Sequence, residues 1–199
     1  MKKIEITVEN AQNAYRNASA DGKELLEHLL GKEIFIPKDV KERIKTFDDA
    51  RNELNRMAEG GDETAAIILA DYESNACNIE NPQTVAYMKL TIIVNALNEG
   101  WVPQFTKDEV RYFPFYWLYT KDEVDAMNDD QRSRLLCVGG NARSGSICGL
   151  SASNAHNGFL ASDAFFGARL AFKTRELALY AARQFVDIWA DYMFSTKNR

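Results

Sequence analysis

The chain has 199 residues, 46% of them hydrophobic, and a formal net charge of −5. That is enough apolar material for the core of one domain or of two small ones. The longest apolar runs are far shorter than the ~20 residues of a membrane-spanning helix, and the first residues lack the apolar stretch of a signal peptide. We therefore expect a soluble chain that is not exported and has no membrane partner.

The basic residues show no clustering that would suit nucleic acid. Residues 1–100 carry 12 basic and 18 acidic side chains, and residues 101–199 carry 12 and 11. Phosphate neutralisation requires a clustered excess of lysine and arginine. A nucleic-acid partner is therefore not expected.

The cysteines and histidines indicate neither a metal site nor a disulfide framework. The three cysteines, Cys77, Cys137 and Cys148, are odd in number and have no CxxC spacing, which argues against both. We expect reduced, buried thiols. The two histidines, His28 and His156, lie far apart in the sequence, so no metal and no cofactor are expected.

The first residues predict a short strand, and helices follow it. Ile4, Ile6 and Val8 alternate with polar residues, and this period of two is typical of a half-buried strand. Pro37 later interrupts the helical pattern, because the residue before a proline favours an extended backbone. Short helices are expected over three ranges: 10–18, 23–30 and 39–44.

Three further helices carry recognisable start signals. Thr46 begins a pattern similar to a capping box, in which its hydroxyl accepts a backbone N–H three residues on. Asp62 can cap the second helix. The third begins at Asn81 with Pro82 in its first position and ends at Gly100. Since this third helix is apolar on most sides, we expect other elements to cover it.

The segment after Gly100 is rich in aromatic residues. Aromatic enrichment between turn residues favours strands, and we expect the rings to fill the core of a small sheet. The alternative is an aromatic platform that stacks on sugar or base rings, which requires exposed rings. The aromatic residues are Trp101, Phe105, Tyr112, Phe113, Phe115, Tyr116, Trp117 and Tyr119.

A glycine-rich region, residues 139–158, separates the aromatic segment from the C-terminus. Its glycines favour a turn between two strands, near 135–138 and 146–151. A further strand is expected over 167–174. Thr174 can then cap one final helix with an apolar stripe, up to residue 194.

Together these patterns predict an α+β fold. Residues 1–98 form a mainly helical part. Residues 99–199 form a small antiparallel β-sheet with a long C-terminal helix, against which the helical part packs. The two parts are either separate domains or one continuous domain.

Two chemistries can be weighed in the glycine-rich region. Cys148 and His156 could form the thiolate–imidazole pair of a cysteine hydrolase, although no local signature supports that pair. Residues 138–149 could cradle a phosphate with backbone N–H groups, but they match neither GxxxxGK[ST] nor GxGxxG. Turn chemistry explains these glycines better.

The loops between Gly139 and Asn157 are the predicted recognition surface. Their residue types offer the mixture of donors and acceptors that recognition loops present at turn tips. A protein or a glycan surface is the expected partner, and the oligomeric state stays open. The candidate ligand-binding residues are Asn141, Arg143, Ser144, Asn154, His156 and Asn157.

Four passages, in this order, resemble a known group of proteins. They are GKEIFIPKDVKERIKTFDDA (31–50), AYMKLTIIVNALNEGWVPQF (86–105), YFPFYW (112–117) and FFGARLAFKTRELALYAARQFVDIWADYMF (165–194). The chain resembles proteins of Bacteroides-type gut bacteria and of their phages and prophages, for which no activity is established. The resemblance implies a phage or mobile-element setting, in the host cytoplasm or on the virion, rather than a reaction. Residues 128–156 are the part least like the group.

The predicted strand near the C-terminus shows a second, shorter resemblance. GARLAF (167–172) is similar to a strand near the end of C-type-lectin-like folds, although the helix expected after it departs from that pattern. We expect a non-enzymatic binding or structural-accessory protein of a phage, prophage or mobile element. The alternative is a hydrolase that uses Cys148 and His156.

Overall fold

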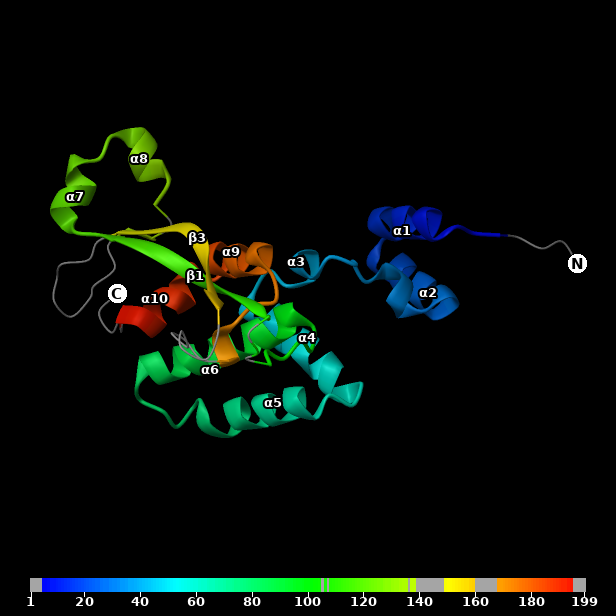
Figure 1. Ribbon diagram of the computed structural model, residues 1–199. Coiled ribbons are helices and arrows are strands. Elements are labelled where there is room, and N and C mark those ends of the chain that lie inside the picture. The colour runs from blue at the N-terminus through cyan, green and yellow to red at the C-terminus, as the bar shows by residue number, and fades with distance from the viewer. Residues whose placement is uncertain are drawn as a thin grey trace, which may run out of the picture. The chain divides into compact units, whose positions relative to one another are not determined.

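The computed structural model describes residues 5–104, 106, 108–135, 137–138, 149–159 and 168–194, with only the backbone described for 137–138, 149–159, 168 and 194. This part of the chain is mostly helical (Figure 1). Its strands form one three-stranded sheet. Its contacts group into two compact units, Met1–Arg43 and Ile44–Arg199. Helices on both sides of residue 98 pack together within the second unit. The predicted parts 1–98 and 99–199, either separate or continuous, stay a prediction.

The first unit consists of short helices. Thr7 caps the first of them by accepting the backbone N–H of Asn10 at 3.2 Å. The strand expected over Ile4–Val8 is therefore wrong for its described residues, because this local cap starts a helix at Val8. The helices are α1 (Val8–Asn17), α2 (Ala20–Leu30), the 3-10 helix η1 (Lys32–Phe35) and α3 (Val40–Arg43).

Tyr15 connects the elements of the first unit. Its ring stacks on Phe35 with centroids 4.3 Å apart, and its hydroxyl donates to Glu27 at 2.5 Å. The hydrogen bond to Glu27 raises the pKa of Tyr15. Gln12 adds a bond from its side-chain amide to the carbonyl of Ile34 at 2.8 Å. Polar and aromatic contacts thus hold α1, α2 and η1 together.

The second unit begins with three helices whose predicted caps are confirmed. Thr46 forms a capping box with Asp49. Asp62 accepts from the backbone of Ala65, and Asn81 accepts from Gln83. The helices are α4 (Phe47–Glu59), α5 (Glu63–Asn75) and α6 (Pro82–Asn98).

Helix α6 lies at the centre of the second unit. Residues 90–94 and 96–98 are buried, and α4, α5 and α10 (Val186–Phe194) all pack against this helix. The expected covering on most sides is confirmed. The helix ends in two left-handed residues, Glu99 (φ 52°) and the predicted Gly100 (φ 81°).

The sheet follows α6 in the chain. Its strand order is β1-β3-β2, and both pairings are antiparallel. The register of β1 against β3 shifts between Phe115 and Tyr116. Helix α9 packs against β1 and β3. The elements are β1 (Val110–Tyr119), α7 (Lys121–Ala126), α8 (Asp129–Ser133), β2 (Cys137–Val138), β3 (Gly149–Phe159) and α9 (Arg175–Gln184).

Two predictions for the C-terminal segment are wrong. The expected strand over 167–174 is the 3-10 helix η2 (Ala168–Leu170), followed by a single bridge between Phe172 and Tyr112. The expected final helix is capped by Thr174 as predicted, but it breaks at Phe185 into α9 and α10. Phe172 pairs with Tyr112 of β1, and the two halves of the broken helix have different partners, since α9 packs on β1 and β3 whereas α10 packs on α6. Sequence periodicity does not encode such distant contacts.

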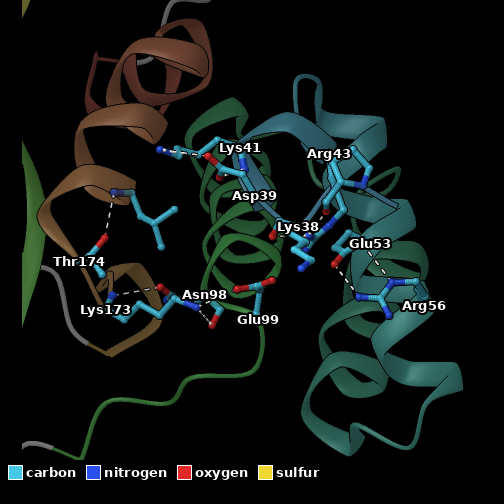
Figure 2. A network of polar contacts seen from close by, with 12 residues as sticks. Lys38, Asp39, Lys41, Arg43, Glu53, Arg56, Asn98, Glu99, Lys173 and Thr174 are labelled. Carbon is cyan, nitrogen blue, oxygen red and sulfur yellow. Dashed lines mark hydrogen bonds and ion pairs between the residues drawn. The ribbon is translucent and has the colours of Figure 1, made fainter. Parts of the chain in front are cut away.

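Asn98 joins the end of α6 to the segment before α9. Its side-chain amide donates to the carbonyl of Ala171 at 2.8 Å, and its side-chain oxygen accepts the backbone N–H of Lys173 at 3.0 Å. The Lys173 ammonium donates to the Asn98 carbonyl at 3.1 Å and pairs with Glu99 at 3.0 Å (Figure 2). Asn98 is 2% exposed, so these bonds replace its hydration.

Replacing Asn98 by alanine should destabilise the second unit by about 2–3 kcal/mol, because both hydrogen bonds of the buried side chain are lost and the backbone groups of Ala171 and Lys173 lose their partner. Unfolding in urea, followed by tryptophan fluorescence, measures this. All three tryptophans (Trp101, Trp117 and Trp189) lie in the second unit.

Asn95→Ala is the matched control. Asn95 makes one bond, to the carbonyl of Thr91 within the same helix, so its loss should cost less than about 1 kcal/mol. Equal losses for the two variants would contradict the role assigned to Asn98.

Candidate binding surface on strand β1

Strand β1 exposes a pair of aromatic rings. Phe115 is 40% exposed and Trp117 is 54% exposed. Their ring centroids lie 5.3 Å apart with the planes at 87°, an edge-to-face contact that fixes each ring against the other. The expectation that the aromatic rings of this segment fill the core is wrong for these two residues.

The exposure of the pair follows from the alternation of side chains along a strand. Phe115 and Trp117 point to the face opposite Tyr116. Tyr116 lies against α9, where its hydroxyl donates to the carbonyl of Ala182 at 2.8 Å. On the side of the pair, Phe113 is buried. The rings thus become exposed only in the second half of the strand.

Charge is confined to the start of β1. Arg111 is 1% exposed, and its guanidinium lies 3.7 Å from the carboxylate of Glu109. Glu109 also accepts the backbone N–H of Gln104 at 2.8 Å. Residues 112–119, YFPFYWLY, contain no ionisable acid or base other than tyrosine. The part of β1 that carries the exposed rings therefore contributes no charged side chain.

The structure places three of the predicted binding residues in a strand rather than at turn tips. Asn154 lies opposite Phe115 in the ladder, His156 opposite Phe113, and Asn157 opposite Tyr112. The loop placement of these residues is wrong, because β3 extends to Phe159. The remaining residues named for binding or catalysis, Asn141, Arg143, Ser144 and Cys148, lie outside the described residues.

A second candidate is a hollow of about 450 Å³ between α5 and α6, bordered also by residues 101–103 and Arg169. Its apolar wall includes Ile67. Three of its polar side chains are engaged, since Thr91 and Asn95 donate to helix carbonyls and Asn98 binds Ala171. A ligand site needs polar groups that converge on the ligand. The surface of β1 is therefore the better candidate.

Other site types receive no support from the residues described. Among them, no three His, Cys, Asp or Glu side chains lie close enough to hold a metal ion. None of the helices in that part of the chain has the length and hydropathy of a membrane span. Cys77 is exposed, so the expectation of a buried thiol is wrong there.

Comparison with known proteins does not assign the chain to a family. The chain matches no family model, no curated protein and no solved structure. The interpretation of the surface therefore rests on its geometry. Residue composition alone located the aromatic segment, but it could not indicate which rings are exposed.

Because Tyr116 is buried against α9, we expect the free energy of unfolding to fall at alkaline pH. Burial raises the pKa of Tyr116 well above its ordinary value of 10.0. Above about pH 10 the unfolded chain therefore releases this proton before the folded chain does, and the free energy of unfolding falls.

Tyr116→Phe should cost about 1 kcal/mol near pH 7 through the lost hydrogen bond, and the difference from the unmodified protein should shrink as the pH rises above about 10. Urea unfolding across this pH range measures it. Tyr192→Phe is the control, since burial raises that pKa as well but less strongly. A difference that stays constant with pH would contradict the assignment.

Proposed function

We propose that the chain is a non-enzymatic binding protein that recognises neutral glycans through Phe115 and Trp117. In this proposal the unit is an α+β arrangement in which α9 backs the sheet and the opposite face meets the ligand. The setting is that of a phage, prophage or mobile element, as the sequence resemblance implies. The protein acts on the virion or in the cytoplasm of the host.

The exposed edge-to-face pair of rings is the observation that carries this proposal. Sugar rings present apolar C–H faces beside hydroxyl groups, and aromatic rings offer a matching apolar surface. Two rings held at 87° and 5.3 Å need little ordering when a ligand binds, so less entropy is lost. Exposed apolar patches on otherwise well-packed proteins commonly mark interaction sites.

The absence of charged side chains from residues 112–119 favours an uncharged ligand. Nucleic acids require lysine and arginine against their phosphates, and residues 112–119 contain neither. In β3, Asn154 lies opposite Phe115 and Ser151 lies opposite Trp117. A neutral glycan suits this combination better than an anionic polymer.

Trp117→Leu should lower the affinity for neutral oligosaccharides about tenfold or more, because the ring face is lost while apolar bulk remains. Trp117→Phe keeps a ring and should retain affinity within about threefold. A panel of neutral oligosaccharides identifies the ligand, and isothermal titration calorimetry then measures the variants. Binding should also be insensitive to salt.

Leu118→Ala is the matched control, because Leu118 is exposed by 46% but points to the opposite face of the strand. Equal weakening by Trp117→Leu and Leu118→Ala would contradict the proposal, and so would a panel without any bound glycan. Binding of a partner protein that Trp117→Leu abolishes would replace glycans with a protein ligand. Co-sedimentation with purified virions separates a particle component from a cytoplasmic factor.

A further inference from the structure

The outer edge of β1 carries backbone groups that can bind another strand. β1 lies at the end of the order β1-β3-β2, and within the described ranges its outer edge pairs only at Tyr112, which exchanges bonds of 3.0 and 2.9 Å with Phe172. Backbone groups alternate between the two edges of a strand. The outer edge therefore also carries the N–H and C=O groups of Tyr116 and Leu118.

This open stretch has defined ends. Pro114 has no N–H group to donate. Thr120 is already engaged, because its N–H donates to Glu123 at 2.7 Å and its carbonyl accepts from Val124 at 3.0 Å. Among the residues that the structure describes, the stretch of edge without a backbone partner is thus limited to 115–119.

Natural edges are commonly protected by charged side chains, and here those are missing. Residues 112–119 carry none of the lysines or acids used for this purpose. The side chains of Phe115, Trp117 and Leu118 are all exposed. An uncharged edge with exposed apolar side chains on both faces is a template for strand addition.

We propose that a second copy of this chain occupies the edge, with the two β1 strands antiparallel about a twofold axis at Trp117. In this register Tyr116 lies opposite Leu118 of the second copy, and Leu118 lies opposite its Tyr116. Each such pair exchanges both backbone hydrogen bonds. Pro114 then lies opposite Thr120 of the second copy. Pro114 has no N–H group, and the N–H of Thr120 already donates to Glu123, so the pairing ends at these residues.

The features of the segment favour a copy of itself as the partner. Two uncharged segments bring no like charges together, which would otherwise destabilise the pair. The alternation of free groups is symmetric about Trp117, as a twofold interface requires. Residues opposite one another in an antiparallel pair point to the same face. The rings of both copies would therefore form one row on one face of a continuous sheet.

Sedimentation velocity of the full chain over a concentration series tests this pairing. The unmodified protein should shift from monomer to dimer as its concentration rises. Leu118→Pro removes the edge N–H and leaves the β3 ladder intact, because proline is tolerated where the N–H faces outward. It should weaken dimerisation about tenfold or more, whereas Leu118→Ala keeps the N–H and should change it less than about threefold.

A protein that stays monomeric up to about millimolar concentration, where even weak complexes with a Kd near 1 mM are populated, would overturn the proposal. Equal weakening by both variants would also overturn it, since side-chain packing would then explain the dimer. If Leu118→Pro fails to fold, hydrogen exchange of the unmodified protein decides. The amides of Tyr116 and Leu118 should become protected as concentration rises, and unchanged exchange would contradict the pairing. These outcomes do not depend on glycan binding.

Discussion

The hydrogen bonds of Asn98 are the constraint on which the second unit depends. Asn98 holds Ala171 and Lys173 against the end of α6, and Phe172, which lies between them, pairs with Tyr112 at the start of β1. One buried amide thus fixes the position of the sheet relative to the central helix. Because unpaired buried backbone groups are costly, small displacements of this segment are strongly opposed.

This attachment leaves the second half of β1 partly open. At its start the strand is paired on both edges, by β3 and by Phe172. Beyond Pro114 the described contacts come from β3 on one edge and from α9 on one face, where Tyr116 binds Ala182. The two proposed interactions use the other face and the outer edge. The pairing at its start holds β1 in place, and both proposed interactions use the second half of the same strand.

Local signals in the sequence predicted much of the fold. The caps at Thr46, Asp62, Asn81 and Thr174 involve residues within four positions, so the sequence specifies them directly. The break at Phe185 and the bridge at Phe172 depend on distant contacts, which periodicity does not encode. For the same reason, the aromatic segment was predictable as a strand, but the exposure of Trp117 was not. That exposure depends on which face α9 covers.

The proposed role of Trp117 requires that this ring is accessible to solvent while Trp189, which is 2% exposed, is enclosed. Acrylamide quenching of two variants, each keeping only one of these tryptophans and phenylalanine at the other two positions, tests it directly. Trp117 should be quenched nearly as readily as free tryptophan, and Trp189 should be strongly shielded. Equal shielding of the two residues would contradict this, because the Trp117 ring proposed to meet the ligand would then be covered.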